Sequence, residues 1–307
     1  MPTCKEGSRL GPWNDRDGTA HYACLYAPPG VTTAKPLPMV VLIHPSLLPA
    51  NAVETWTNLL DSLDSADLSG DPQSRGFIMI APQGRDTHHY YARPDTSGLG
   101  WDNWYRQFNP GGDVTTDERV YPENVDVAAI DHFIAEQVAT GKVDRERIYL
   151  IGWSNGEAMA YLYGLNRSSI AAAAIYSAPD PYELALDLCP QSPVTHPPAN
   201  AKEIQITNAH LPTYQVHNNC DIAGICSNIT FFVEQLHGLG LEAMNTIIDR
   251  AQNQVARCDE KCGTDKDGDL LNLSAASQGT LNHLRWPDKW TAKMFDFLRD
   301  HPLKKTP

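Results

Sequence analysis

The residues whose types and spacing most clearly indicate a chemical reaction lie at 152–156, where the sequence reads GWSNG. This G-x-S-x-G pattern follows a predicted strand at 147–151 and precedes residues of high helix propensity. A sharp strand-to-helix turn leaves no space for side chains two residues before and after its central serine, so glycine is needed there. Such a turn exposes the Ser154 hydroxyl and aims the N-terminus of a helix at developing negative charge. The pattern predicts a nucleophilic serine, and a tight turn with a solvated serine is the alternative.

A serine hydroxyl needs a base within hydrogen-bond reach and a carboxylate that orients the base. In proteins with this turn the chain order is serine, then Asp or Glu, then histidine. His283 fits the base because it stands in an expected loop just before the last predicted helix. Among the other downstream histidines, His217 comes before the candidate acid and His237 lies within a helical pattern. We therefore predict His283 as the base, with an ordinary loop histidine as the alternative.

Asp221 is the candidate orienting carboxylate, because it follows the predicted strand at 213–217 by a short loop. Its negative charge would hold the imidazole of His283 in the required tautomer and stabilise the imidazolium. An Asx-type turn is the alternative role for Asp221. Asp180 and Asp187, which follow an earlier predicted strand, and Asp249 are rival carboxylates.

Strand and helix patterns alternate along the chain, and this alternation predicts how the three side chains meet. Continuously apolar runs at 38–43 and 77–81 indicate strands that are covered on both faces. Apolar residues at helical spacing indicate helices at 51–63 and 123–138. Further strands are expected at 19–26, 147–151, 171–176, 213–217 and 245–249, and further helices at 155–165, 227–238 and 288–300. The alternation predicts an α/β fold, a doubly wound and mostly parallel sheet with helices on both faces and its chemistry at the carboxyl ends of the strands.

Charge and hydropathy limit the classes of partner. The 307 residues carry a net charge of −13, which argues against nucleic acid or an anionic membrane as a partner, because both require basic patches. No apolar run approaches the roughly 18 residues of a spanning helix. No linker divides the chain, so we expect a single domain over 1–307, with an aromatic-rich loop at 82–122 and a loop region at 251–287 near the site.

Seven cysteines stand in the chain, at 4, 24, 189, 220, 226, 258 and 262. A Cys4–Cys24 bridge could tie down the N-terminus, and the close pairs 220/226 and 258/262 could close short loops, which leaves Cys189 over. There are two alternatives. The four cysteines of the close pairs could form a metal site, or the cysteines could be inert buried thiols. Disulfides imply an oxidising compartment. No signal peptide is visible after Met1, so we expect a secreted protein whose leader was removed, or else a cytoplasmic one.

Five stretches together resemble the α/β-hydrolase fold and, within it, the polyhydroxybutyrate depolymerase and feruloyl esterase type of secreted esterase. These stretches are VVLIHPS (40–46), WDNWYRQFNP (101–110), RIYLIGWSNG (147–156), YQVHNNCD (214–221) and NHLRWPD (282–288). The resemblance implies that Ser154, Asp221 and His283 form a catalytic triad. It also implies that the backbone N–H groups of Ser46 and Asn155 form the oxyanion hole.

Three residues depart from the pattern of this family. The segment after the strand at 38–43 reads His-Pro-Ser where the family has His-Gly-x, and Pro45 fixes a backbone angle that glycine leaves free. Asn282 replaces the glycine that usually precedes the histidine. Glu157 replaces a second glycine of the turn, which predicts either altered helix packing or a carboxylate near the cleft.

Aromatic residues near these stretches are candidates for substrate binding, because aromatic faces stack on sugar rings, phenolic acids or polyester segments. Trp101 and Trp104 belong to one aromatic cluster, Trp153 lies inside the serine turn, and Trp286 follows the proposed base by three residues. A hydrophobic plug beneath a long loop is the alternative for Trp101 and Trp104.

One acidic segment, DKDGD at 265–269, resembles the start of a calcium loop. The glycine and glutamate required at the sixth and twelfth positions are absent, since Leu270 and Ala276 stand there. We therefore interpret the segment as a polar turn and predict no metal, with a bound calcium ion as the alternative.

Taken together, these residues predict a serine ester hydrolase that works without a cofactor. We expect its substrate to be a small-molecule or polymeric ester. The expected ester is an aryl or short-chain acyl ester, either on plant polysaccharide or within a polyester. Two other classes remain as alternatives. One is a peptidase or acyltransferase that uses the same three residues, and the other is a non-catalytic binding protein, as the departures at Pro45, Asn282 and Glu157 could suggest.

Overall fold

The computed structural model describes residues 1–15, 18–84, 99–101, 125–177, 206–208, 210–219, 221, 227–248 and 278–304. The strands in these residues are β1 (Ser8–Asn14), β2 (Ala20–Tyr26), β3 (Leu37–Ile43), β4 (Ile78–Pro82), β5 (Val143–Trp153), β6 (Ala172–Tyr176), β7 (Thr213–Asn218) and β8 (Ala243–Ile248). The helices are α1 (Val53–Trp56), α2 (Val125–Ala139), α3 (Asn155–Gly164), α4 (Ser227–Gly238), α5 (Gln278–His283) and α6 (Asp288–Asp300), with short 3-10 turns at η1 (Ala50–Ala52) and η2 (Leu60–Ser62). None of these helices is long and apolar enough to cross a bilayer.

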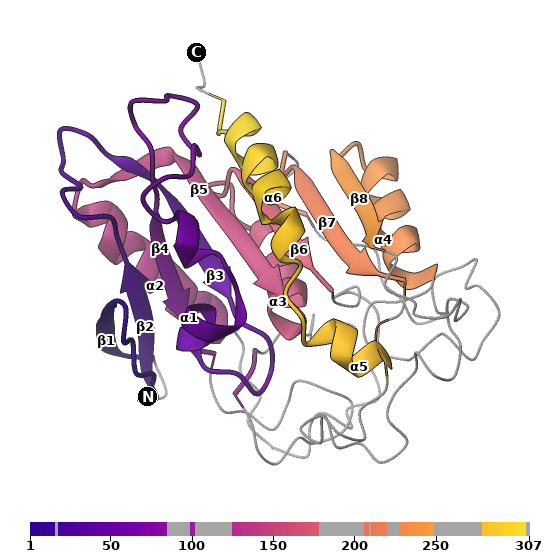
Figure 1. Ribbon diagram of the computed structural model, residues 1–307, viewed down its shortest axis with the longest axis horizontal. Coiled ribbons are helices and arrows are strands. Elements are labelled where there is room, and N and C mark those ends of the chain that lie inside the picture. Colours follow the sequence, from indigo (N-terminus) through magenta and orange to yellow (C-terminus); the bar gives the residue numbers. More distant parts are fainter. Residues whose placement is uncertain are drawn as a thin grey trace.

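The described strands form one eight-stranded sheet in the order β1-β2-β4-β3-β5-β6-β7-β8 (Figure 1). The β1–β2 and β2–β4 pairs are antiparallel, and every pair from β4–β3 to β7–β8 is parallel. The mostly parallel sheet predicted from the sequence is therefore confirmed.

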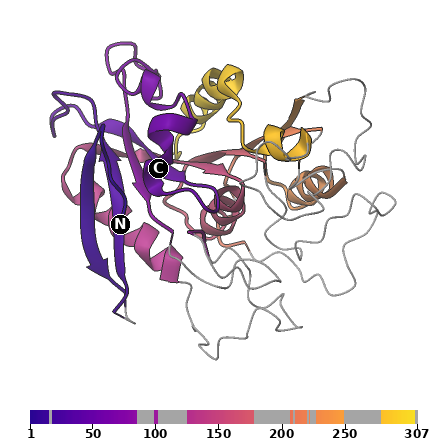
Figure 2. The ribbon, with the colours of Figure 1, turned by 60° about the horizontal axis from the view of Figure 1, so that its bottom comes forward.

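Helices cover both faces of this sheet, with α1 and α6 on one side and α2, α3 and α4 on the other (Figure 2). The side chains of β3 alternate between the two layers. Met39, Val41 and Ile43 belong to the core shared with α2, α3 and α4, while Val40 and Leu42 belong to the core shared with α1 and α6. Because both faces are covered, all residues of β3 are buried, which explains why its sequence is continuously apolar.

The carboxyl ends of β3, β5, β6 and β7 meet at one edge of the sheet. The strand register pairs Ile43 with Gly152, Trp153 with Tyr176, and Tyr176 with Val216. In Figure 1 the arrows of these strands point to the same edge, where α5 also lies. Residues that directly follow these strands are therefore brought close together.

Two segments differ from the elements expected from the sequence. The predicted helix at 51–63 is divided into η1, α1 and η2, and α1 ends at Trp56 because Thr57 has an extended backbone (φ −135°, ψ 165°). The Thr57 hydroxyl donates to the Val53 carbonyl (3.0 Å) and accepts from the Leu59 N–H (3.3 Å), and such side-chain bonds compete with those of a helix. Strand β1 was not predicted, because a glycine and a proline interrupt the alternating pattern of this edge strand.

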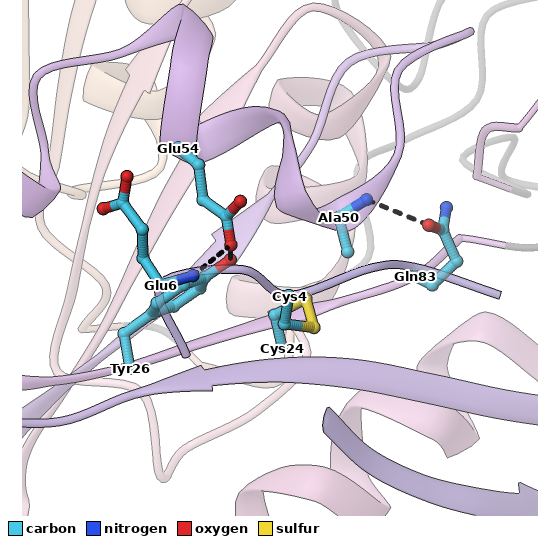
Figure 3. Close-up of a disulfide and its surroundings, with 7 residues drawn as sticks. All are labelled: Cys4, Glu6, Cys24, Tyr26, Ala50, Glu54 and Gln83. Carbon is cyan, nitrogen blue, oxygen red and sulfur yellow. Dashed lines mark hydrogen bonds between the residues drawn. A yellow bond between two sulfur atoms is a disulfide. The ribbon is translucent and has the colours of Figure 1, made fainter. Parts of the chain in front are cut away.

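The N-terminal segment is tied to the sheet at one corner (Figure 3). Cys4 forms a disulfide with Cys24 of β2, which confirms that predicted pair. Glu54 of α1 accepts hydrogen bonds from the Tyr26 hydroxyl (2.9 Å) and from the Glu6 N–H (3.2 Å). Burial and the hydrogen bond to Glu54 raise the pKa of Tyr26, so its hydroxyl stays protonated as a donor. The other cysteines of the chain lie outside the described residues.

Candidate active site

Ser154 lies on the turn between β5 and α3, with a positive φ (φ 57°, ψ −128°) that is uncommon outside glycine. Flanking glycines make this turn possible. A Cβ atom at Gly152 would lie 2.7 Å from the carbonyl oxygen of Gly156, and a Cβ atom at Gly156 would lie 2.1 Å from the carbonyl oxygen of Ile43. Both approaches are too close for a side chain, so the predicted need for glycine at these two positions is confirmed.

Three side chains from separate elements meet beside this turn. His283 Nε2 lies 2.7 Å from Ser154 Oγ, and His283 Nδ1 lies 2.7 Å from Asp221 Oδ1. Asp221, just beyond β7, is fully buried, and Ser154 and His283 are almost fully buried. The structure thus brings together the three residues that the sequence singled out as nucleophile, acid and base.

His283 is the last residue of α5, which corrects the expectation that it stands in a loop and that the whole region 251–287 is a loop. The Leu284 N–H donates to the Thr280 carbonyl (3.0 Å), so helical bonding runs through the histidine. The indole N–H of Trp153 donates to the His283 carbonyl (3.0 Å). The backbone that carries the imidazole is therefore anchored to the end of β5.

Aromatic side chains pack around this anchored segment. The rings of Trp153 and Trp286 meet edge to face with centroids 5.8 Å apart, and those of Tyr176 and Trp286 do so at 5.7 Å. The Tyr176 hydroxyl donates to the Asn282 carbonyl (2.9 Å), which links β6 to α5. Both tryptophans are almost fully buried, and substrate binding by Trp153 and Trp286 remains a prediction.

The second oxygen of Asp221 has partners that the sequence reasoning missed. Ser177 Oγ donates to Asp221 Oδ2, and Asn218 Nδ2 donates to the same oxygen at 2.6 Å. Ser177 Oγ also lies 3.3 Å from His283 Nδ1. Ser177 directly follows β6, so the only sequence signal was a small polar residue at the end of a predicted strand.

His44 begins the segment after β3 that is expected to supply one oxyanion donor, the N–H of Ser46. His44 Nδ1 donates to the Pro45 carbonyl (2.8 Å), and His44 Nε2 accepts from the Gly84 N–H (2.9 Å). The side-chain amide of Gln83, drawn in Figure 3, also lies 3.0 Å from Nε2. Burial lowers the pKa of His44 to about 4, so the imidazole is neutral at neutral pH. A neutral histidine thus fixes the segment in which Pro45 stands.

Trp101 connects the two segments that carry the expected oxyanion donors. Its indole N–H donates to the His44 carbonyl (2.8 Å), and its backbone N–H donates to Asn155 Oδ1 (2.7 Å). The side chain is fully buried, and its ring centroid lies 4.9 Å from that of His44. Substrate binding by Trp101 remains a prediction, and Trp104 lies outside the described residues.

Glu157 is fully buried in the first turn of α3. Its Oε1 accepts from Gln215 Nε2 at 2.6 Å, and Gln215 Oε1 accepts from the Tyr161 hydroxyl at 2.7 Å. The carboxyl group therefore joins α3 to β7. This contact agrees with the altered helix packing that was one of the two roles expected for Glu157.

No group of three or more His, Cys, Asp or Glu side chains in the described part of the chain could hold a metal ion. The cysteines of the alternative thiolate site and the acidic segment at 265–269 lie outside that part.

Solved structures share the architecture that positions these residues. The chain superposes on a thermostable esterase with a TM-score of 0.54 at 15% sequence identity, over 97% of this chain and 64% of that chain. The chain has the α/β-hydrolase fold. Arabidopsis thaliana SOBER1 superposes with a TM-score of 0.50 at 12% identity, over 86% of this chain and 98% of that chain. This α/β-hydrolase chain thus spans 64% of the length of the thermostable esterase. No protein-family model and no curated protein matches it.

Proposed function

We propose that this α/β hydrolase is a serine carboxylic ester hydrolase that works through an acyl-enzyme. One observation carries the proposal, the continuous chain of contacts from Ser154 Oγ to His283 Nε2 and from His283 Nδ1 to Asp221 Oδ1, each 2.7 Å long. Distances of this length allow a proton to pass from the hydroxyl to the imidazole as the oxygen attacks a carbonyl carbon. The carboxylate of Asp221 then stabilises the imidazolium that forms.

The proposed reaction has two halves. Ser154 Oγ attacks the ester carbonyl while His283 takes its proton, and the N–H groups of Ser46 and Asn155 hold the oxyanion. Asn155 begins α3, and the first N–H groups of a helix have no partner within that helix. His283 then gives the proton to the oxygen of the alcohol as the ester C–O bond breaks. The alcohol departs, and the acyl group stays bound to Ser154 Oγ. In the second half, water attacks this acyl group with the proton transfers in the reverse order.

The substrate class rests on the resemblance to feruloyl esterases and polyhydroxybutyrate depolymerases. We propose aryl or short-chain acyl esters, on plant polysaccharide or within a polyester, with Trp101, Trp104, Trp153 and Trp286 as the aromatic residues near the bound acyl group. We also propose that residues 1–307 act as a single domain and that the protein is secreted. The Cys4–Cys24 disulfide supports an oxidising compartment.

Active-site labelling tests the proposal directly. A fluorophosphonate probe should add its mass to the wild-type protein at Ser154 and leave the Ser154→Ala variant unlabelled. A panel of methyl ferulate, p-nitrophenyl acetate, p-nitrophenyl butyrate and a polyhydroxybutyrate film then separates the ester classes, and a p-nitroanilide tests amide cleavage. Ser154→Ala should lower the rates by several orders of magnitude. Absence of the adduct, together with no hydrolysis of any ester in the panel, would overturn the proposal.

A further inference from the structure

We propose that Ser177 is a positioning residue, whose hydroxyl orients both Asp221 and His283 for proton transfer. The inference rests on the proposed function and adds a fourth side chain to the three that the sequence indicated. Ser177 touches neither Ser154 nor the expected oxyanion donors in any described contact. It acts on the reaction through the acid and the base alone.

The first part of the evidence is the set of donors on the Asp221 carboxylate. Asp221 is fully buried, and a buried charge is costly unless hydrogen bonds replace its lost water. Oδ1 faces His283 Nδ1, while Oδ2 accepts from Ser177 Oγ and from Asn218 Nδ2. Because both oxygens accept hydrogen bonds, the carboxylate cannot rotate without losing at least one of them. Ser177 thus helps to keep Oδ1 pointed at the imidazole.

The second part is the position of the same hydroxyl beside the imidazole. A serine hydroxyl carries one proton and can accept hydrogen bonds through its oxygen lone pairs. The proton of Ser177 goes to Asp221 Oδ2, so the lone pairs of Oγ remain for the Nδ1–H of His283, 3.3 Å away. Nδ1 therefore faces two acceptors, Asp221 Oδ1 and Ser177 Oγ. This arrangement favours the tautomer with the proton on Nδ1 and leaves Nε2 free to accept the proton of Ser154.

The third part is the backbone of Ser177, which has a φ of 63°. Residues other than glycine rarely adopt this conformation, because the Cβ atom crowds the backbone, and such outliers cluster at functional sites. The Ser177 N–H donates to the Val216 carbonyl on β7 (3.1 Å), which holds the strained residue in place. Glycine would fit this conformation with less strain, but glycine has no hydroxyl. The residue present is therefore the one that supplies the contacts to Asp221 and His283.

Two substitutions separate the hydroxyl from the backbone. Ser177→Ala removes the hydroxyl and keeps a Cβ atom, whereas Ser177→Gly removes the hydroxyl and relieves the backbone strain. Tyr214→Phe is the matched control, because it also deletes one hydroxyl contact, to Thr246 Oγ1 at 3.1 Å, but on the far side of β7. We expect both Ser177 variants to lower kcat roughly 10- to 100-fold with little change in KM, as expected for loss of a hydrogen bond to a charged group. The control should keep the wild-type kcat.

Two further readouts distinguish positioning from a merely structural role. Loss of the Ser177 hydroxyl removes both a donor to Asp221 Oδ2 and an acceptor for the Nδ1–H of His283, so the acidic limb of the kcat/KM profile should shift in both Ser177 variants and not in Tyr214→Phe. The NMR resonance of the His283 Nδ1–H should shift in both Ser177 variants and not in Tyr214→Phe, and this measurement needs no ester turnover. Wild-type kcat and an unshifted resonance in both variants would overturn the inference. Full activity in Ser177→Gly with a loss only in Ser177→Ala would also overturn it, because both variants lack the hydroxyl. A wild-type protein that takes no fluorophosphonate and cleaves no ester would instead overturn the proposed function, while the resonance would still report on Ser177.

Discussion

The two halves of the site are held in place by different kinds of contact. The relay half, formed by Ser177, Asn218, Asp221 and His283, is built from side chains that bond to one buried carboxylate. The oxyanion half, formed by His44–Ser46, Trp101, Asn155 and Gly156, is held mainly by bonds to backbone groups and by close backbone packing. Its one titratable side chain, His44, is kept neutral by burial.

This difference indicates how each half should respond to change. In the relay half a substitution can alter the position of a proton while the strands beneath stay in place, so the rate should change more than the stability. In the oxyanion half the donors are backbone N–H groups, and they move only if the backbone moves. Substitutions there should therefore lower the stability and the rate together.

Asp221→Asn should have the largest effect on the rate. Asp221 Oδ2 faces two donors, so the amide oxygen of asparagine should take that place and turn its NH2 group toward His283 Nδ1. His283 Nδ1 would then have to accept a hydrogen bond from that NH2 group, so the imidazole proton would lie on Nε2. An imidazole that already carries a proton on Nε2 could not take the proton of Ser154. We expect kcat to fall about 10⁴-fold with little loss of thermal stability.

Steady-state kinetics and a thermal unfolding curve check this prediction for Asp221→Asn. Asp296→Asn is the control, since it removes an exposed carboxylate that pairs with Arg299 on α6. A loss of kcat below about tenfold in Asp221→Asn would contradict the assigned role of the carboxylate.

Gly156→Ala should damage the oxyanion half through the backbone. The new Cβ atom would lie 2.1 Å from the Ile43 carbonyl oxygen and 2.4 Å from that of His44, so α3 and the end of β3 must move apart. Because each segment carries one expected oxyanion donor, we expect kcat/KM to fall about 100-fold or more, with a loss of stability of about 1–3 kcal/mol. The measurements are kcat/KM and the free energy of unfolding in urea.

Gly238→Ala is the matched control for Gly156→Ala. A Cβ atom at Gly238, the last residue of α4, would meet nothing within 4 Å. This variant should keep full activity, and its stability should stay the same or rise slightly, since alanine favours a helix over glycine. If the two alanine variants had equal stability and activity, the oxyanion half would not depend on its backbone packing, and the contrast with the relay half would be wrong.

The sequence predicted those parts of the molecule that depend on local sterics and chain order. The glycines around Ser154 follow from the geometry of one turn, and the apolar run of β3 follows from a strand covered on both faces. Asp221 and His283 could be chosen because the order of the three residues is fixed in this fold. In each case the deciding constraint lies within a few neighbouring residues or in a known order of elements.

The parts that were missed depend on neighbours distant in the chain. Ser177 gains its importance only because β6 pairs with β7 and its end is hydrogen-bonded to α5, and nothing in the residues around Ser177 indicates that. Trp101 was predicted to be either a substrate contact or a hydrophobic plug, and neither prediction included its hydrogen bonds to His44 and Asn155, 57 and 54 residues away. The break at Thr57 depends on a side-chain hydrogen bond that the apolar spacing of 51–63 conceals.

Lowering the pH should lower the free energy of unfolding, because His44 of the oxyanion half is buried in its neutral form. The folded pKa of His44 is about 4 against an ordinary value of 6.5, so between these values the unfolded chain takes up a proton that the folded protein does not. The contribution is fully present above pH 6.5 and is lost as the pH falls through this window. The loss should reach about 3 kcal/mol of unfolding free energy near pH 4.

The direct measurement is an NMR titration of the His44 imidazole, which should show a midpoint near pH 4. Urea unfolding across the same pH range should show a smaller decline for His44→Gln than for the wild type, because glutamine does not titrate. A midpoint near 6.5 would mean that the imidazole is not held neutral by burial, and the two halves would then both depend on titrating groups.

Trp101→Phe should have the smallest effect and gives the sharpest comparison with Ser177. The substitution deletes the indole N–H bond to the His44 carbonyl, while the backbone bond to Asn155 can remain. We expect kcat/KM to fall about tenfold and the stability to fall by about 1 kcal/mol or more, with the pH profile unchanged, because the lost hydrogen bond goes to a backbone carbonyl and not to a titrating side chain. Trp13→Phe, in the edge strand β1, is the control. A shifted acidic limb in Trp101→Phe would show that the oxyanion half is coupled to the proton relay, and the division drawn between the two halves would be wrong.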